Sequence, residues 1–194
     1  MERPQTGLYF GSFDPIHLGH LIIAEHLQNQ GALDEIWFVL SPQNPLKTGR
    51  QLTQTHLRMQ MLQLAIENNP AFSICDAELH MPPPHYTLRT LKKLQEKHPE
   101  KDFVLIIGSD NLEVFDQWKD YNLILEQFPV WVYPRPGYPP RKFLHFSNLK
   151  LQQAPLLEIS STHIRESFAT GRPARYMLPQ LVYQYISENR LYGA

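Results

Sequence analysis

Short apolar runs alternate along the chain with segments in which apolar residues recur at helical spacing. The runs predict five β-strands, at residues 8–10, 35–40, 72–74, 103–107 and 130–133. The helical spacing predicts helices over residues 18–27, 57–66, 88–94, 164–168 and 181–186, and shorter ones near 112–115 and 122–127. Residues 41–51 and the proline-rich segment after residue 133 are typical of loops, and residues 142–157 show no clear pattern.

Polar residues and glycines mark where the predicted helices begin and end. Thr53 and Thr87 are placed to cap the second and third helices, and a cluster of hydroxyl residues at 160–162 can start the helix over 164–168. Gly31 supplies a stop signal after the first helix. Arg58, within the second helix, could serve equally as a structural ion-pair partner or as a phosphate ligand.

The order of these elements predicts an α/β fold with a doubly wound, mostly parallel sheet and right-handed crossovers. We expect a single domain over residues 1–194, helical in its C-terminal part from about residue 160. Ligands of such sheets bind beyond the carboxyl ends of the strands, where the strand order reverses. The loops after Phe10, Leu40 and Ile107 are therefore the first candidates for a site.

Composition and charge narrow the class of protein. A content of 42% hydrophobic residues with a formal net charge of -1 is typical of a globular chain and excludes nucleic-acid binding through a basic field. No apolar run approaches the roughly 18 residues that a membrane span needs. The single cysteine, Cys75, excludes an intramolecular disulfide and suits the reducing cytoplasm. We expect a cytoplasmic protein with neither a nucleic-acid nor a membrane partner; its oligomeric state is not readable from one chain.

The stretch GSFDPIHLGH, residues 11–20, follows the first predicted strand and carries the strongest chemical signal. If the helix starts at Leu18, His17 and His20 lie on one face of its first turn, where exposed backbone N–H groups favour an anion. Gly11 lets the backbone approach a ligand closely. Two alternatives remain: metal ligation, which Asp14 could join but which lacks a full ligand set, and incidental histidines.

Two motifs link the chain to a known superfamily. His17-Leu18-Gly19-His20 resembles the signature of the nucleotidyltransferases that carry an HxGH motif, and ISSTHIR, residues 159–165, is similar to their second signature. Further segments resemble the bacterial nicotinate-nucleotide adenylyltransferase family: SPQNPLK at 41–47, HYTLRTL at 85–91, IIGSDNLEVFDQW at 106–118, YPRPG at 133–137 and YISENRLY at 185–192. The resemblance covers nearly the whole chain and implies a Rossmann-like nucleotidyltransferase fold.

The chain departs from the family pattern at two places. Phe10-Gly11-Ser12 stands where the family usually has Gly-Gly-Thr, and Ser12 keeps the hydroxyl. His85 replaces the usual serine before Tyr86 and Thr87, which puts any side-chain role of that serine in doubt. Neither change removes the chemistry that the resemblance implies.

That chemistry is transfer of AMP from ATP to nicotinate mononucleotide, which gives nicotinate adenine dinucleotide and pyrophosphate in NAD biosynthesis. The resemblance implies catalytic roles for His17, His20, Lys47 and Arg165. It implies that ATP is bound by these two histidines, by Arg165 and by Gly11, Ser12, Phe13, Gly108, Asp110, Ser160, Ser161 and Thr162. Mg²⁺ is expected as the cofactor, held mainly by the ATP phosphates and water rather than by a protein metal site.

The resemblance also implies an acceptor side, with Trp118 as a stacking platform and with Thr87 and Arg135 as further substrate-binding residues. Trp118 packing under a loop is the plainer alternative. Two alternative functions remain open. One is another HxGH adenylyltransferase, with nicotinamide mononucleotide or phosphopantetheine as acceptor; the other is a non-catalytic nucleotide-binding protein with the same fold.

Overall fold

The chain folds around a six-stranded parallel sheet. The computed structural model describes residues 3–42 and 52–194. Its strands are β1 (Gln5–Gly11), β2 (Glu35–Leu40), β3 (Phe72–Cys75), β4 (Asp102–Gly108), β5 (Val130–Tyr133) and β6 (Leu149–Leu151). They lie in the order β3-β2-β1-β4-β5-β6, and every neighbouring pair is parallel. This confirms the predicted doubly wound α/β class, and the sheet is parallel throughout.

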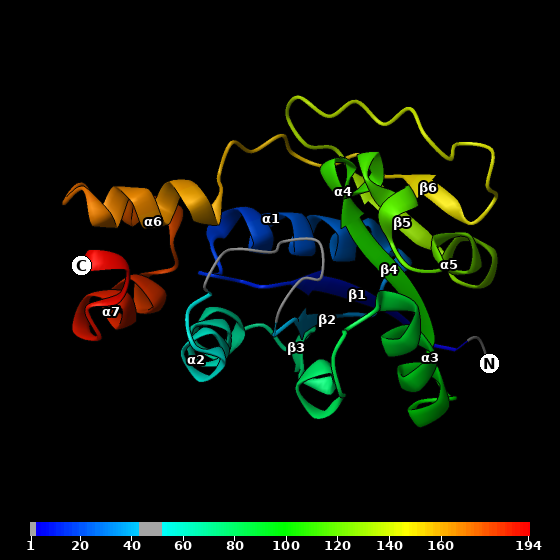
Figure 1. Cartoon of the computed structure of the whole chain (residues 1–194), viewed down its shortest axis with the longest axis horizontal. Helices are drawn as coiled ribbons and strands as arrows, with labels where there is room; N and C mark the ends of the chain where they lie inside the picture. The colour runs from blue at the N-terminus through cyan, green and yellow to red at the C-terminus, as the bar shows by residue number, and fades with distance from the viewer. Residues whose placement is uncertain (1–2, 43–51) are drawn as a thin grey trace.

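Helices connect the strands and extend the chain beyond the sheet (Figure 1). The α-helices are α1 (Leu18–Leu27), α2 (Thr55–Ile66), α3 (Thr87–Lys97), α4 (Ser109–Glu113), α5 (Tyr121–Gln127), α6 (Ser161–Ala169) and α7 (Gln180–Glu188). Shorter turns are the π-helical η1 (Gln28–Ala32) and the 3₁₀ turns η2 (Ala77–His80), η3 (Phe115–Gln117), η4 (Arg175–Met177) and η5 (Leu191–Gly193). The elements predicted from the apolar pattern are all present.

The strands bury both faces because their side chains alternate between two core clusters. Tyr9, Phe38 and Ile106 join a cluster that includes residues of α1, α2, α6 and α7. Leu8 and Val39, their neighbours along the strands, join a second cluster that includes residues of α3 and α5. Continuous apolar runs such as residues 103–107 are therefore what a sheet covered on both sides requires.

Some predicted helix boundaries are wrong by one or two residues. The N-cap of α2 is Gln54 rather than Thr53, and the N-cap of α3 is Tyr86, so that Thr87 is the first helical residue. Ser160 does cap α6, because its hydroxyl accepts a hydrogen bond from the His163 N–H at 3.2 Å. Gly31 lies inside η1, in which the chain continues to wind after α1 instead of stopping.

Strand order reverses between β1 and β4, the two central strands. From β1 the chain continues through α1 to β2 on one side, whereas β4 leads to β5 on the other. The loops after both strands therefore diverge and leave a crevice at their carboxyl ends. Figure 1 shows α6 and α7 beyond this end of β1 rather than over the sheet. The carboxyl ends of β1 and β4 are thus where a site is expected.

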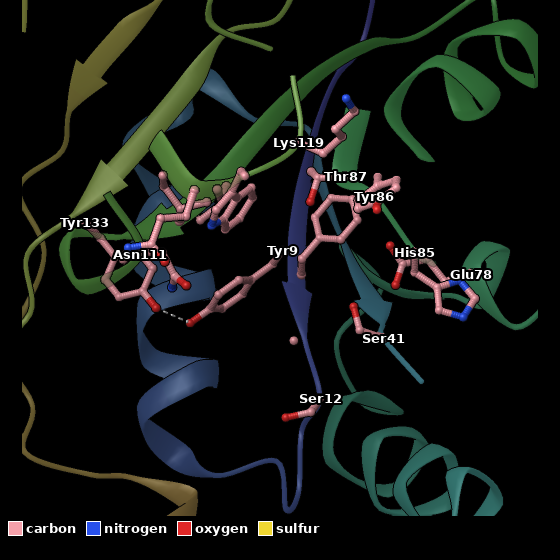
Figure 2. A pocket seen from close by; sticks show the side chains of 17 residues that line it. Tyr9, Ser12, Ser41, Glu78, His85, Tyr86, Thr87, Asn111, Lys119 and Tyr133 are labelled. Atoms are coloured by element: carbon pink, nitrogen blue, oxygen red, sulfur yellow. Dashed lines mark hydrogen bonds between the residues drawn. The ribbon is translucent and has the colours of Figure 1, made fainter. Parts of the chain in front are cut away.

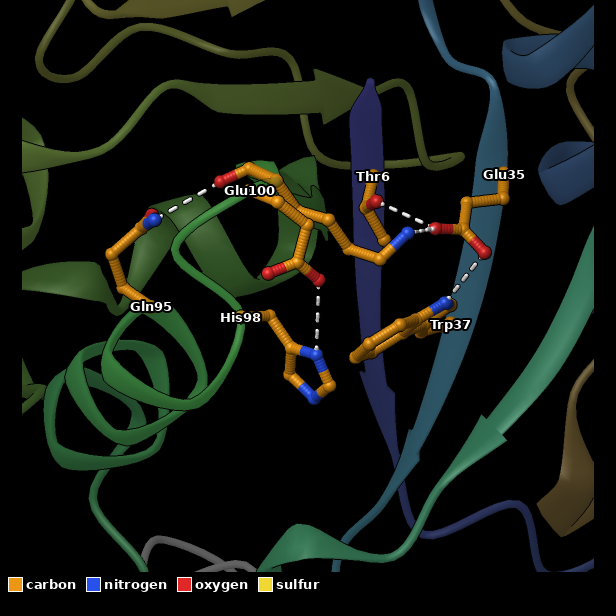
Figure 3. A network of polar contacts seen from close by, with 7 residues as sticks. Thr6, Glu35, Trp37, Gln95, His98 and Glu100 are labelled. Carbon is orange, nitrogen blue, oxygen red and sulfur yellow. Dashed lines mark hydrogen bonds and ion pairs between the residues drawn. The ribbon is translucent and has the colours of Figure 1, made fainter. Parts of the chain in front are cut away.

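The opposite, amino end of the sheet is held by polar contacts around Glu35 (Figure 3). Thr6 Oγ1 donates to Glu35 Oε1 at 2.9 Å, Trp37 Nε1 donates to Oε2 at 2.8 Å, and Lys101 Nζ forms an ion pair with Oε1. Partial burial on its own would favour neutral Glu35, but the hydrogen bonds from Lys101, Trp37 and Thr6 outweigh it and lower the pKa of the carboxyl. The ionised carboxylate ties β1 and β2 to the start of β4.

We expect Glu35→Gln to lower the free energy of unfolding at pH 7 by about 1 kcal/mol, because the charge-assisted bond to Lys101 is lost. A lowered carboxyl pKa contributes stability above the unfolded pKa and loses it as the pH falls through the folded value. The difference between wild type and variant should therefore shrink below pH 4 in urea titrations. A difference that stays constant with pH would contradict this assignment.

Candidate active site

A cavity of about 420 Å³ opens at the carboxyl ends of β1 and β4. Residues 9–12 and 106–108 line it from these two strands, and Trp118 and residues 85–87 line it from the loops before α3 and α5. Figure 2 shows Tyr133 and Asn111 on one side of the cavity, and Ser41, Glu78 and His85 on the other. The crevice predicted from the strand order is therefore a real hollow, of a size that suits a small organic ligand.

The paired histidines lie at the start of α1, where the His20 ring packs against Tyr9, a residue of the cavity lining. His17 is the N-cap and is 3% exposed, while His20 lies in the first turn. Their rings stack with centroids 3.7 Å apart, and the His17 N–H donates to His20 Nδ1 at 3.3 Å. Tyr9 and Phe13 pack edge-on against the His20 ring. Both imidazoles are thus fixed at a helix terminus whose backbone N–H groups favour an anion.

Gly19, between the two histidines, permits close packing at this point. A Cβ at Gly19 would lie 3.0 Å from His17 Nδ1 and 3.3 Å from Ile159 Cβ. Both distances are tighter than ordinary van der Waals contact. The glycine therefore lets the His17 ring lie against the helix and lets the segment before α6 approach it.

The second motif meets the first at the start of α6. Ser161 Oγ donates to the Pro15 carbonyl at 2.9 Å, and Arg165 Nη1 donates to the Asp14 carbonyl at 2.6 Å. Arg165 Nη2 donates to Thr162 Oγ1 at 2.9 Å. The N-termini of α1 and α6, far apart in the sequence, are in this way linked through the loop at Asp14 and Pro15, so the predicted Ser160–Thr162 cluster and Arg165 join the histidine site.

Arg58 holds the same loop from the other side and is structural rather than a phosphate ligand. Its side chain is 1% exposed and its guanidinium donates to the carbonyls of Ser12 at 2.6 Å, Ser41 at 2.9 Å, Pro42 at 3.1 Å and Thr53 at 2.9 Å. One buried side chain thus connects the loop after β1 with the loop after β2. Its partners are backbone carbonyls rather than the ion-pair carboxylate or the ligand phosphate that the sequence left open.

The C-terminal turn completes the support of this loop. Tyr192 Oη donates to Asp14 Oδ1 at 2.8 Å. Burial, and then the neighbouring Asp14 charge, raise the pKa of the Tyr192 hydroxyl, which keeps it a donor. Asp14 therefore shapes the turn, because its side chain receives Tyr192 while its carbonyl receives Arg165.

His17 is neutral in the folded protein. Burial, and then the charge of Arg135, hold the pKa of its imidazole at about 3. Its Nδ1 is buried and has no hydrogen-bond partner among the residues that the structure describes. A neutral imidazole still carries one N–H donor. The site therefore presents a hydrogen-bond donor rather than a fixed cation at His17.

The low His17 pKa has a measurable consequence for stability. Between pH 6.5 and the folded value, the unfolded chain binds a proton at His17 that the folded chain does not. Stability should therefore fall on acidification by roughly 1.4 kcal/mol per pH unit from this residue alone. Urea titrations from pH 6 to pH 4.5 should show this slope in the difference between wild type and His17→Gln. Parallel curves would show that His17 titrates normally.

The predicted adenosine side lies where β4 ends. Gly108 lines the cavity, and Asp110 follows in the first turn of α4. Arg135 Nε lies 3.9 Å from Asp110 Oδ2, and its backbone N–H donates to Ser109 Oγ at 2.8 Å. Asp110 and Arg135 are therefore an ion pair beside Gly108, close enough for Arg135 to act on the His17 pKa.

Two of the three predicted acceptor residues, Thr87 and Trp118, occupy the cavity wall, whereas Arg135 is not among the lining residues. The Trp118 ring also packs against Phe115 at a centroid distance of 4.9 Å. Packing and ligand contact are thus compatible for this ring.

Gly11 and Ser12 line the cavity as well, whereas the Phe13 side chain is buried in the core and leaves only its backbone for a ligand. Lys47 lies outside the described residues.

Several cavity residues were not predicted from the sequence. Tyr9 and Tyr133 are both buried and share a hydrogen bond of 3.0 Å between their hydroxyls. Their position near the ends of β1 and β5 was a usable signal, because polar groups there face the crevice. Glu78 and Lys119 also line the cavity. Lys119 directly follows Trp118 and could have been found from it, whereas nothing local distinguishes Glu78.

The side chains near the histidines determine how a metal ion could be held at this site. Within residues 3–42 and 52–194 there is no cluster of three or more His, Cys, Asp or Glu side chains that could hold a metal ion. Of the carboxylates near the histidines, Asp110 pairs with Arg135 and Asp14 accepts from Tyr192. With these carboxylates already engaged, the site suits a divalent ion whose main ligands are polyphosphate oxygens and water rather than protein side chains. None of the helices in the described part of the chain has the length and apolar content of a membrane-spanning segment.

The parallel sheet, the switch-point cavity and the histidine-bearing helix terminus define a nucleotidyltransferase-type nucleotide site. Consistent with this, the sequence profile of the cytidylyltransferase-like family matches residues 8–167.

Individual relatives narrow the assignment. The "Probable nicotinate-nucleotide adenylyltransferase" of Bacteroides fragilis is 46% identical over 186 residues, 96% of this chain and 92% of that protein. A protein of the same name from Cytophaga hutchinsonii is 43% identical over 189 residues, 97% of this chain and 98% of that protein. The solved Plasmodium falciparum nicotinic acid mononucleotide adenylyltransferase complexed with NaAD superposes with a TM-score of 0.82 at 25% identity, over 97% of each chain. The chain belongs to the nicotinate-nucleotide adenylyltransferase family of nucleotidyltransferases.

Proposed function

We propose that this protein transfers the AMP moiety of ATP to nicotinate mononucleotide, forming nicotinate adenine dinucleotide and pyrophosphate in NAD biosynthesis. The observation that carries the proposal is the junction of the two motifs: stacked His17 and His20 at the start of α1, linked to the start of α6 beside a cavity at the switch point. The family membership of the chain supports the same reaction.

The reaction needs no covalent enzyme intermediate and no general base. A phosphate oxygen of the mononucleotide, already ionised, attacks the α-phosphorus of ATP. The bond from that phosphorus to the bridging oxygen breaks, and pyrophosphate leaves with the electron pair. Two anions must meet in line while charge grows on the leaving group, so catalysis rests on positioning and on donors for that charge.

The residues around the junction supply those donors. His17 and His20, with the backbone N–H groups of α1, donate to the ATP phosphates, and His17 faces the α-phosphate. Arg165 and the hydroxyl cluster at residues 160–162 hold the triphosphate tail at the start of α6. Lys47 adds a further positive charge. Gly11, Ser12 and the Phe13 backbone form the phosphate loop, and Gly108 and Asp110 contact the adenosine ribose.

The acceptor occupies the other part of the cavity. Trp118 stacks on its pyridine ring, and backbone N–H groups near Thr87 and Trp118 receive its carboxylate. Arg135, paired with Asp110, serves the phosphate of the mononucleotide or organises the site. Mg²⁺ would be held mainly by the ATP phosphates and water, and would supply charge neutralisation for the pyrophosphate. We propose that the reaction takes place in the cytoplasm. The chain has a single cysteine, Cys75, which suits a reducing compartment.

The test is a product assay with three acceptors. Purified protein is incubated with ATP, Mg²⁺ and either nicotinate mononucleotide, nicotinamide mononucleotide or phosphopantetheine, and both pyrophosphate and the dinucleotide are quantified. The proposal predicts the highest kcat/KM with nicotinate mononucleotide. Turnover only with phosphopantetheine would assign another adenylyltransferase, and nucleotide binding without pyrophosphate release would assign a binding protein.

A further inference from the structure

Two tyrosine hydroxyls meet in the wall of the cavity and have no role in the substrate contacts proposed above. Tyr9 lies in β1 and Tyr133 ends β5, so the two side chains reach each other across β4, the strand between them. Their hydroxyls share a hydrogen bond of 3.0 Å, drawn as a dashed line in Figure 2. Both residues line the cavity, although Tyr9 is only 4% and Tyr133 only 7% exposed.

The pair carries one more proton than its own hydrogen bond uses. Each phenol hydroxyl has one O–H donor, and whichever hydroxyl donates to the other, the second keeps its proton. Within residues 3–42 and 52–194, neither hydroxyl has a further hydrogen-bond partner. Burial raises the pKa of both side chains, so both protons are retained at neutral pH. One buried O–H is therefore left without a protein acceptor, which calls for an explanation.

The Tyr9 ring is fixed against the histidine side of the site. It packs against Phe13 and Phe38, with ring centroids 6.0 Å and 5.7 Å away, and against the His20 ring at 6.0 Å. These contacts hold the hydroxyl at one place, because the ring has no room to move in a packed cluster. The hydroxyl is thus preorganised next to the imidazole that we assign to the ATP phosphates.

The Tyr133 ring is fixed against the other side, where β4 ends. A Cβ at Gly108 would lie 3.2 Å from Tyr133 Cζ and 3.0 Å from Arg135 Cγ. The glycine thus leaves the space that the tyrosine and the arginine occupy. The charges of Asp110 and Arg135 both act on the Tyr133 hydroxyl, which places it beside this ion pair.

The hydroxyl pair therefore lies between the two halves of the proposed ATP site. His20 is on the side of the phosphates, and Gly108 and Asp110 are on the side of the ribose. In ATP the α-phosphate joins the ribose to the rest of the triphosphate, and it is also the group that the acceptor phosphate attacks. A donor between the two halves thus faces the phosphates that react, and an anionic oxygen is the acceptor with which an O–H forms its strongest hydrogen bond.

We propose that the Tyr9–Tyr133 pair is a further catalytic element, which donates its second O–H in a hydrogen bond to a non-bridging oxygen of the reacting phosphates. This inference rests on the proposed function and adds a neutral donor to the two histidines. No proton is transferred, because the hydroxyl stays protonated and acts by stabilising the charge on the oxygen that it contacts.

The experiment measures kcat and the KM for both substrates in wild type, Tyr9→Phe, Tyr133→Phe and the double variant, at a temperature where all four are folded. Phenylalanine keeps the ring packing and removes only the hydroxyl. We expect the kcat of the double variant to fall about 10–100-fold, as for a lost hydrogen bond to a charged group. The single variant that removes the donating hydroxyl should lose as much as the double variant, because the two hydroxyls act as one unit.

Tyr138→Phe is the matched control. Tyr138 is 48% exposed in the loop after β5 and does not line the cavity, so its kcat should stay within about twofold of wild type. The KM values of the cavity variants identify the phosphate that accepts the bond. An additional rise confined to the KM for ATP assigns the α-phosphate, and a rise confined to the KM for the mononucleotide assigns the acceptor phosphate; either one supports the proposal.

A normal kcat with both KM values within twofold of wild type in the double variant would overturn the inference, and would leave the pair as a structural link between β1 and β5. Two single variants with normal kcat would overturn it as well, so the test holds even if the double variant does not fold. Wild-type protein that forms no dinucleotide from ATP and nicotinate mononucleotide would instead contradict the proposed function, and this inference with it.

Discussion

Replacing His17 by alanine should lower kcat by about 10²–10³-fold while the protein stays folded, because one preorganised donor to the reacting phosphate is lost. The structure makes this variant informative: the ring is buried, neutral and stacked on His20, so it has no surface ion pair to lose. The effect should lie in kcat more than in the KM for either substrate, since the donor acts most strongly where charge develops.

The matched control for this variant is His145→Ala. His145 is exposed and lies in the segment before β6, outside the cavity lining. Its removal should leave kcat within twofold of wild type (about 0.4 kcal/mol). A folded His17→Ala protein with a near-normal rate would exclude His17 from catalysis.

Replacing Arg58 by methionine should lower the free energy of unfolding by more than about 3 kcal/mol. The guanidinium satisfies the carbonyls of Ser12, Ser41, Pro42 and Thr53, and methionine fills the volume but leaves these acceptors without a donor. Because the same contacts join the loops after β1 and β2, catalytic activity should fall as well, even at a temperature where the variant is folded.

Chemical denaturation of Arg58→Met beside Arg141→Met gives the comparison. Arg141 is exposed in the loop after β5, so its replacement should change stability by no more than about 0.5 kcal/mol. Equal stabilities for the two variants would mean that the buried guanidinium contributes nothing to the fold.

The sheet was predictable because its strands are continuous apolar runs. β1 to β5 each contribute side chains to the core clusters on both faces of the sheet, so few polar residues interrupt these runs. β2 and β5 have the predicted bounds, and β4 extends the prediction by one residue at each end. β6 was missed for a physical reason. Its three residues lie at the sheet edge, and Lys150 and Leu151 are exposed, so no apolar run marks it. Its place in the sheet depends on pairing with β5, which local sequence does not encode.

The site was predictable where its chemistry is local. The histidines, the glycine between them and Ser160 are positioned by the helix termini in which they lie, and both motifs could be recognised by their spacing. The roles of Arg58 and Tyr192 depend instead on partners 46 and 178 residues away in sequence. Such contacts arise only when the loops after β1 and β2 and the C-terminal turn meet in the folded chain.

The central claim is that the α1 terminus with its stacked imidazoles, joined to the start of α6, holds the phosphates of ATP. A crystal structure of the protein with Mg²⁺ and the non-hydrolysable α,β-methylene analogue of ATP tests it most directly. The account predicts the triphosphate within hydrogen-bonding distance of His17, His20 and Arg165, with the adenosine beyond Gly108. A nucleotide bound elsewhere, or a metal ion ligated by the two histidines in that corner, would contradict it.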